Sequence, residues 1–260
     1  MEKREAPIAE ALEQYRRRRR ASFHVPGHKA GAAYAREADD AAHALSVIGA
    51  YDATELPGLD DLHAPAGAIA RAQELAAGCF GADRTYFLVG GSTVGNLAAI
   101  FAAVRPGELL VMQRDSHKSA MHALMLREAG AVFVASAPDA ETLLPGPVGA
   151  DRIAAALDAY PEAKAVFITS PNYYGMAADI GRIAAEAHAR GKPLIVDEAH
   201  GAHFGRHPRF PPSALSQGAD AVVQSTHKML PALTMGAMLH LRGGRIDGRR
   251  VEAYLRMLQS

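Results

Sequence analysis

Four groups of polar residues each follow a short apolar run, and together they could hold a flat, charged ligand. The first is the stretch 90–96, GGSTVGN, in which Gly91, Ser92 and Thr93 open a helical pattern. Glycines let backbone amides approach an anion, and a helix N-terminus adds partial positive charge. This stretch predicts a phosphate-binding loop, with an ordinary Ser/Thr helix cap as the alternative.

The second and third groups carry a histidine and a carboxylate. His117 follows the apolar run 109–112, and Asp197 follows the run Leu194-Ile195-Val196. A histidine in this position could stack on a planar ring or cap the next helix. A carboxylate at the end of a buried strand costs desolvation energy unless a positive partner meets it, and a protonated pyridinium nitrogen is such a partner.

The fourth group is the stretch 225–228, STHK, which ends in Lys228. A lysine at the mouth of a sheet can have a lowered pKa, which makes its amine nucleophilic and able to form an imine. Taken alone, each group could also have an ordinary structural role, such as a helix cap or a solvated surface residue. A ring cofactor with a phosphate tail needs an anion cradle, a stacking group, a carboxylate for the ring nitrogen and an imine-forming lysine, and the sequence offers all four.

The elements that must position these groups alternate along the chain. Apolar runs typical of buried strands occupy 85–89, 109–112, 131–134, 165–169, 193–197, 221–224 and 236–241. Helical patterns occupy the first 20 or so residues, 66–80, 94–104, 118–129, 151–160, 179–190 and 251–258. The alternation predicts an α/β three-layer sandwich around a mostly parallel seven-stranded sheet, in which ligands bind beyond the carboxyl ends of the strands.

Composition narrows the class of protein. Lysine plus arginine and aspartate plus glutamate both total 28, so no global field attracts nucleic acid or an anionic membrane. The basic run Arg17–Arg20 is expected to be the solvated end of the first helix. The single cysteine, Cys79, excludes an intrachain disulfide, suits a reducing compartment and is expected to be buried. With no secretory signal and no long apolar run, a cytoplasmic protein is expected.

The motifs from His24 onward resemble the major domain of the ornithine/lysine/arginine decarboxylase family. They are HVPGHK at 24–29, TELPGLDDLHAP at 54–65, GGSTVGN at 90–96, DSHKS at 115–119, SPNYYG at 170–175, DEAHGAHF at 197–204 and QSTHKMLPALTMG at 224–236. Together they are specific, although no single one would be.

The resemblance implies the large domain of a fold type I, pyridoxal 5'-phosphate (PLP)-dependent transferase-like enzyme. Lys228 would bind the cofactor aldehyde, Asp197 would pair with the ring nitrogen, and His117 would stack on the ring; these three are the expected catalytic residues. Ala199 would pack on the other ring face, and His200 stands where some members have a bulkier aromatic residue. The phosphate would be held by Gly91, Ser92, Thr93, Ser225 and His227.

The implied reaction is decarboxylation of arginine, lysine or ornithine to a polyamine-type amine. A homodimer or higher oligomer is expected, with the arm 21–51 reaching a partner subunit. The resemblance divides the chain into an N-terminal helix and arm (1–50) and a PLP-binding large domain (51–260), with the small C-terminal domain absent. Glu55, Asp60 and Asp61 are candidates to meet the substrate's distal charge, or else form a solvated acidic loop or helix cap.

Other functions stay open from the sequence. The chain could be a truncated, non-catalytic remnant, or another fold type I enzyme such as a transaminase or aldolase. LIVDEAH at 194–200 matches the acidic box of a helicase-type ATPase, but the glycine loop lacks that class's lysine. His200, His203 and His207 are spaced like ligands of a metal hydrolase, but glycines and a proline interrupt the helix that would align them. No metal is therefore expected.

Overall fold

A computed structural model of the chain describes residues 5–18, 21–36 and 39–260. The chain divides into two compact units, Met1–Ala76 and Ala77–Ser260. Arg19 and Arg20, which belong to the basic run, lie outside the described residues. The division expected after residue 50 stays a prediction.

The first unit contains α1 (Pro7–Arg17), α2 (Asp40–Gly49) and most of α3 (Ala68–Phe80). The sequence pattern predicts α1 and α3 but not α2. The start signal of α2 was nevertheless present, because the Asp39 carboxylate accepts a hydrogen bond from the backbone N–H of Ala42, as an N-cap does.

Asp60 serves as a cap in this unit. Its carboxylate accepts hydrogen bonds from five backbone N–H groups, those of Asp61, Ala66, Gly67, Ile69 and Ala70. Burial works to raise the pKa of this carboxyl, but the backbone donors outweigh it and lower the pKa to about 2. The helix-cap interpretation is therefore favoured for Asp60, whose oxygens are occupied by the start of α3.

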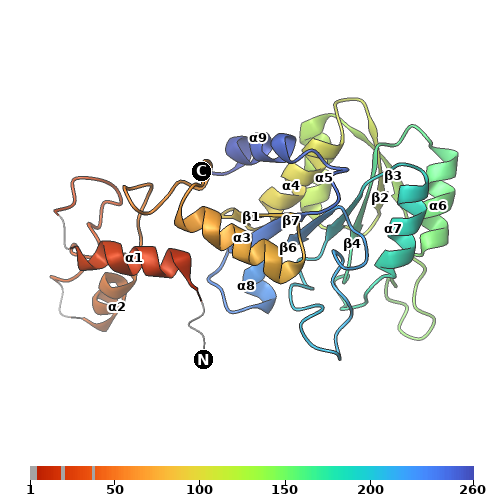
Figure 1. Cartoon of the computed structure of the whole chain (residues 1–260). Coiled ribbons are helices and arrows are strands. Elements are labelled where there is room, and N and C mark those ends of the chain that lie inside the picture. Colours follow the sequence, from red (N-terminus) through yellow and green to blue (C-terminus); the bar gives the residue numbers. More distant parts are fainter. Residues whose placement is uncertain (1–4, 19–20, 37–38) are drawn as a thin grey trace. The chain divides into compact units, whose positions relative to one another are not determined.

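Within the described residues, seven strands of the second unit form one sheet (Figure 1). They are β1 (Arg84–Leu88), β2 (Leu109–Gln113), β3 (Gly130–Val134), β4 (Ala165–Thr169), β5 (Leu194–Asp197), β6 (Ala221–Gln224) and β7 (Ala237–Leu241). Their order is β1-β7-β6-β5-β4-β2-β3, and β7 runs in the direction opposite to the other six strands. The predicted mostly parallel α/β sandwich is confirmed.

Helices cover both faces of the sheet, giving two cores. One core contains side chains of α4 (Gly91–Ala103), α5 (Lys118–Arg127) and α9 (Gly248–Leu258), packed on strand residues such as Ile195 and Val223. The other contains α6 (Ala150–Ala159) and α7 (Ile180–Ala189), packed on Val196 and Val222. Because side chains alternate along a strand, neighbouring residues of β5 and β6 face different helices.

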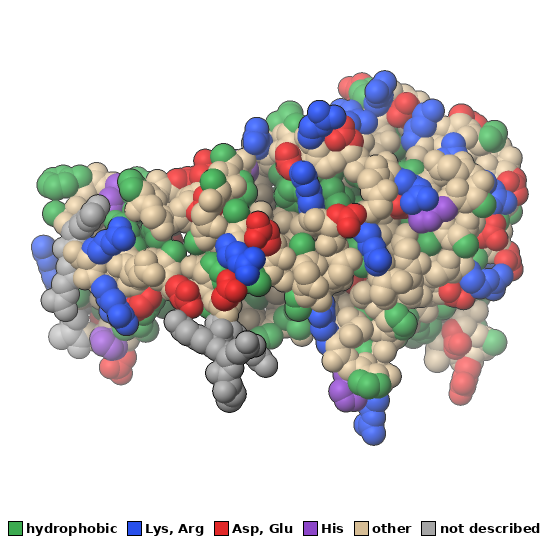
Figure 2. All heavy atoms as spheres, viewed as in Figure 1, with side chains coloured by type: hydrophobic (Ala, Val, Ile, Leu, Met, Phe, Trp, Pro, Cys, Tyr) green, Lys and Arg blue, Asp and Glu red, His purple; other side chains and the backbone are tan. Residues whose placement is uncertain are grey.

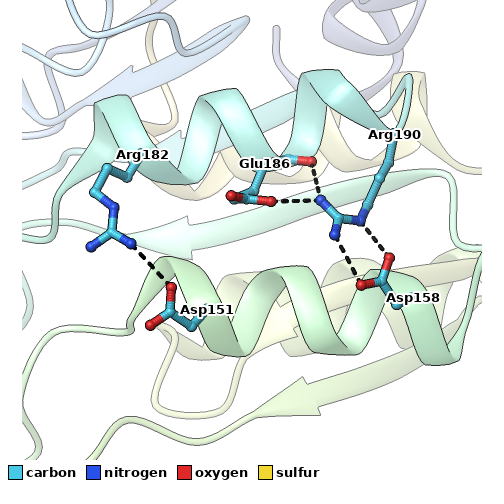
Figure 3. Close-up of polar contacts among 5 residues, drawn as sticks. All are labelled: Asp151, Asp158, Arg182, Glu186 and Arg190. Atoms are coloured by element: carbon cyan, nitrogen blue, oxygen red, sulfur yellow. Dashed lines mark hydrogen bonds and ion pairs between the residues drawn. The ribbon is translucent and has the colours of Figure 1, made fainter.

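Ion pairs join α6 and α7 at their surface (Figure 3). Arg190 binds Asp158 through two nitrogens, at 2.7 and 2.9 Å, and Arg182 lies 3.1 Å from Asp151. The carboxylates are largely exposed, and exposed pairs contribute little to stability. The buried core between these helices and the sheet therefore fixes their placement.

The surface carries charges of both signs. Lys and Arg side chains are interspersed with Asp and Glu side chains on the face seen in Figure 2. None of the helices in the described ranges has the length and apolar character needed to span a membrane.

The expectation of a buried Cys79 is wrong, because the residue is exposed. The adjacent Phe80 instead packs inward, with its ring 4.8 Å from that of His240. The guanidinium of Arg206 donates a 2.7 Å hydrogen bond to the Cys79 carbonyl and lies 3.3 Å from its sulfur. The helical pattern did not distinguish which of the two neighbours faces the core.

Close contact between α4 and the sheet depends on Gly95. A Cβ built there would lie 2.7 Å from both Leu88 Cδ1 and Val223 Cγ1. We predict that Gly95→Ala lowers the free energy of unfolding by about 1–2 kcal/mol, because overpacking outweighs the gain in helix propensity. Gly78→Ala in α3 is the matched control; nothing lies within 4 Å of its Cβ, and a gain of about 0.5–1 kcal/mol is expected. Urea denaturation measures both, and an unchanged midpoint for Gly95→Ala would contradict the packing argument.

Candidate functional site

The predicted site residues gather at the carboxyl edge of the sheet in the second unit. Strands β5 and β6 are parallel, with Asp197 paired to Val223, so the residues that follow each strand emerge at the same edge. The N-terminus of α4 follows β1, and that of α5 follows β2. This topology brings together segments that lie more than a hundred residues apart in sequence.

Asp197 is 2% exposed and ends β5. Its carboxylate accepts hydrogen bonds from Asn96 Nδ2 at 2.8 Å and from the backbone N–H of Ala199 at 3.1 Å. Burial raises the pKa of this carboxyl above its ordinary value, while these donors and the charges of His117 and Lys228 oppose the rise. No ion pair to Asp197 occurs among the described residues, so its charge is only partly compensated.

His117 is the N-cap residue of α5, as one of its two interpretations expected. Its Nδ1 accepts a hydrogen bond from the backbone N–H of Ser119 at 3.2 Å and lies 2.8 Å from the Ser119 hydroxyl. Because a backbone N–H can only donate, the proton of a neutral His117 is on Nε2. Burial, the largest effect, lowers the pKa of this imidazole against the opposing charge of Asp197.

Lys228 is exposed and lies on the short helix α8 (Thr226–Met229), which follows β6. Its Nζ is 3.3 Å from His200 Nε2. Burial and then the charge of Lys228 lower the pKa of His200, so that this imidazole is an acceptor for the ammonium group. The electrostatic influence of Lys228 also reaches Asp197 and His117. The structure thus brings these four ionisable groups together.

The predicted phosphate loop is at the N-terminus of α4. The helix begins at Gly91, three residues earlier than expected, with φ of +69° at this glycine and no side-chain cap. The first-turn amides therefore lack the Ser/Thr cap that was the alternative interpretation. Ser225 donates a 2.9 Å hydrogen bond to the Ser92 hydroxyl, which joins the β6 end to this loop.

The remaining predicted residues lie along the same segments. Thr93 is exposed on the first turn of α4, and Ala199 is buried directly after Asp197. His227 donates from Nδ1 to the carbonyl of Gly236 at 2.9 Å, which leaves its Nε2 as the other ring nitrogen. The metal interpretation gains no support: among the residues described, no group of three potential ligands converges, and the rings of His203 and His207 pack against Phe210.

Sequence reasoning missed two positioning residues, Asn96 and Ser119. Both lie inside motifs already quoted, and both are buried. Asn96 Nδ2 donates to Asp197 and, at 2.9 Å, to the Ser119 hydroxyl. A polar residue beyond the first turn of α4, followed only by apolar residues, was the signal that could have identified Asn96.

A second buried network lies on the other side of β5, at Glu198. This carboxyl accepts hydrogen bonds from Gln224 Nε2 at 2.7 Å and the backbone N–H of Ala214 at 2.8 Å. Gln224 Oε1 accepts from His240 Nε2 at 3.1 Å, and His240 Nδ1 accepts from the Thr85 hydroxyl at 2.8 Å. Each hydrogen bond in this chain is donated in the direction of Glu198. Burial raises the pKa of the Glu198 carboxyl to about 7.

A sequence model of the family described as Orn/Lys/Arg decarboxylase, major domain, matches residues 6–260. The chain belongs to this family. It is 49% identical over 255 residues to the Bacillus subtilis protein called uncharacterized protein YaaO, covering 98% of this chain and 52% of that protein. It is 36% identical over 260 residues to an arginine decarboxylase of Bacillus subtilis, covering 99% of this chain and 52% of that enzyme.

The family assignment agrees with the solved structures. The lysine decarboxylase LdcF of Francisella novicida superposes with a TM-score of 0.81 at 21% identity, over 98% of this chain and 38% of that one. At this identity the likeness shows the fold. The chain spans about half the length of the curated relatives, 52% in both cases given.

Glu198 gives this decarboxylase-family domain a predictable pH dependence. Its folded pKa of about 7 lies above the ordinary value of 4.5, so the folded state holds a proton that the unfolded chain releases between these values. The contribution of Glu198 to stability is therefore full below about pH 4.5 and falls as pH rises to about 7.

We predict that Glu198→Gln removes this fall, on the order of a few kcal/mol. As pH rises from about 4.5 to about 7, the unfolding free energy of the wild type should fall relative to that of the variant. Urea denaturation at a series of pH values measures it. Burial lowers the pKa of His240 to about 3. Because His240 titrates in both proteins, its contribution cancels in the difference between them. A difference that is constant with pH would show that Glu198 does not titrate there.

Proposed function

We propose that this chain is the PLP-binding part of a decarboxylase of a basic amino acid: arginine, lysine or ornithine. The observation that carries the proposal is the convergence of a buried, only partly compensated carboxylate at Asp197 with the Lys228 amine at one sheet edge. Family membership and relatives named arginine decarboxylase and lysine decarboxylase support the same chemistry.

The residues present fit PLP. Asp197 is a buried carboxylate that lacks a cation in direct contact among the described side chains, and a protonated ring nitrogen would compensate its charge. Gly91, Ser92 and Thr93 would offer uncapped amides and hydroxyls to the phosphate at the start of α4, and Ser225 is hydrogen-bonded to Ser92. His227, two residues after Ser225, would add its Nε2. His117 and Ala199 would contact the two ring faces.

The proposed roles of the protein groups follow from their hydrogen bonds. When bound, PLP supplies an electron sink for the pair left at Cα as the carboxylate leaves as carbon dioxide. Asp197 would accept a hydrogen bond from a protonated ring nitrogen and so favour the protonated form, which is the better electron sink. His117, held by its Nδ1 at the cap of α5, presents its ring and the Nε2 proton to the site.

Lys228 must lose a proton before its amine can attack a carbonyl carbon. His200 Nε2, at 3.3 Å from Nζ, is an acceptor for that proton. The exchange leaves Lys228 neutral and His200 protonated at both nitrogens. The same proton can return from His200 to Lys228 when the amine must be protonated again. His200 is therefore proposed as the general base for Lys228.

The finer parts of the proposal are the oligomer and the compartment. We propose a homodimer or higher oligomer in the cytoplasm. A basic amino acid would be its small-molecule substrate, and neither nucleic acid nor a membrane would be a partner.

We predict that the chain supplied with PLP releases carbon dioxide from one of arginine, lysine and ornithine, and that Lys228→Ala abolishes the release. The measurement is product analysis with each amino acid in turn. Lys118→Ala is the matched control, since this exposed lysine also lies near His117 and its loss should preserve activity. If carbon dioxide is released from none of the three amino acids, the chain would instead be a non-catalytic PLP-binding domain.

Covalent trapping separates these outcomes. Borohydride reduction with PLP present, followed by peptide mass spectrometry, should place the label on Lys228 in wild type and in Lys118→Ala. A label on another lysine, or none, would refute the proposed role of Lys228 whatever the assay of carbon dioxide gives.

Replacement of His200 should slow the reaction of Lys228 with PLP. We predict that His200→Phe lowers the rate of covalent capture near pH 7 on the order of 10²-fold, the usual contribution of a general base. Near pH 10, where a lysine loses its proton without help, the deficit should shrink. Stopped-flow absorbance measures both rates; an equal deficit at both pH values would instead assign His200 a packing role.

A further inference from the structure

The contacts of Asn96 connect the two predicted ring-binding groups. Asn96 is fully buried on α4, one turn beyond Ser92 at the phosphate loop. One Nδ2 group donates to Asp197 Oδ2 at 2.8 Å and to the Ser119 hydroxyl at 2.9 Å. The Ser119 hydroxyl lies 2.8 Å from His117 Nδ1. A continuous path therefore runs from the Asp197 carboxylate to the His117 imidazole.

The direction of each hydrogen bond on this path is determined. The Asn96 amide has two protons on Nδ2, and both are donated, one to Asp197 and one to Ser119. Ser119 Oγ therefore accepts from Asn96 and is free to donate its own proton to His117 Nδ1. His117 Nδ1 also accepts from the Ser119 backbone N–H, so both donors favour the Nε2-protonated tautomer.

Asn96 Oδ1 is buried and has no hydrogen-bond partner within the described part of the chain. A reversed amide would instead set Oδ1 against the Asp197 carboxylate, and that would suit only a protonated Asp197. The observed orientation therefore leaves one acceptor unpaired and directs both donors into the site. Buried polar atoms are seldom left unpaired without a reason of this kind.

We propose that Asn96 is a positioning residue that holds Asp197 as the ionised acceptor for a ring-nitrogen proton and, through Ser119, holds His117 in its Nε2-protonated tautomer. This inference rests on the proposed function, because the ring is that of PLP. It gives one helix, α4, two tasks: its N-terminus carries the phosphate loop, and its second turn sets the charge state and hydrogen bonds of the ring contacts.

The first test uses the full chain without PLP. In Asn96→Leu, Asp197 loses a donor to its ionised form, so its midpoint of titration, followed by carboxyl ¹³C NMR, should rise by about one pH unit or more. The near-isosteric Asn96→Asp should shift it in the same direction, because two adjacent carboxyls cannot both ionise readily. This variant preserves the test if Asn96→Leu does not fold.

The second arm concerns His117. Ser119→Ala removes the hydroxyl donor and retains the backbone N–H. His117 should therefore keep its Nε2-protonated tautomer in ¹⁵N NMR but titrate at a higher pH, because one of the two donors that oppose protonation of Nδ1 is lost. Ser213→Ala is the matched control: Ser213 is also buried, and its hydroxyl accepts from Ser216 within its own turn. It should leave both titrations as in wild type.

Affinity for PLP then connects the network to the ligand. Asn96→Leu should raise the Kd for PLP about tenfold or more, and Ser213→Ala should leave it unchanged. The inference would be overturned if Asn96→Leu and Asn96→Asp both folded and Asp197 titrated in them as it does in wild type. If wild type itself fails to bind PLP, the proposed function falls, while the titrations without PLP still decide whether Asn96 controls Asp197.

Discussion

The burial of the Asp197 carboxylate is the constraint on which the rest of the site depends. A charge that is 2% exposed at the end of a sheet strand is tolerated only where donors or cations face it. Here the donors are Asn96 and the Ala199 amide, and they compensate the charge only in part. The site is thus arranged for one further positive group. This requirement explains why α4 and α5, otherwise apolar on their inner faces, each contribute a buried polar residue at this edge.

The alternation of side chains along β5 and β6 separates two polar networks that would otherwise merge. Val196 and Val222 face the α6/α7 core, while Ile195 and Val223 face the α4 core. Asp197 therefore points toward α4, and Gln224 points to the opposite face. Adjacent acids in one motif thus belong to different networks. Asp197 is bonded to Asn96 in the proposed ring-binding network, and Glu198 ends the hydrogen-bonded chain that runs through Gln224 and His240 to Thr85 on β1.

The sequence was sufficient for the strands, most helices and the groups at their ends, because continuous apolar runs and helical periodicity depend on local composition. It was insufficient where the outcome depended on which neighbour faces a core, as at Cys79 and Phe80, or on a partner far along the chain. Asn96 and Asp197 are 101 residues apart, and no spacing rule joins them. The helix α2 was missed because its Asp39 cap lies between segments that were interpreted as loop. Asp60 illustrates the same limit, since its commitment to five backbone amides cannot be inferred from an acidic motif.

Exposure decreases from the Lys228 amine to the Asp197 carboxylate across the site, and this gradient suits the role proposed for each group. Asp197 is buried at the end of β5, between two parallel neighbouring strands, so its carboxylate would face the proposed ring nitrogen from a fixed position. The Lys228 side chain is exposed on a four-residue helix, and its Nζ lies 3.3 Å from His200 Nε2. Under the proposed function, this lysine would bind the cofactor and then give it up to a substrate, so its side chain would have to move. Its exposed side chain can make that movement without disturbing the buried hydrogen bonds among Asn96, Asp197 and Ser119.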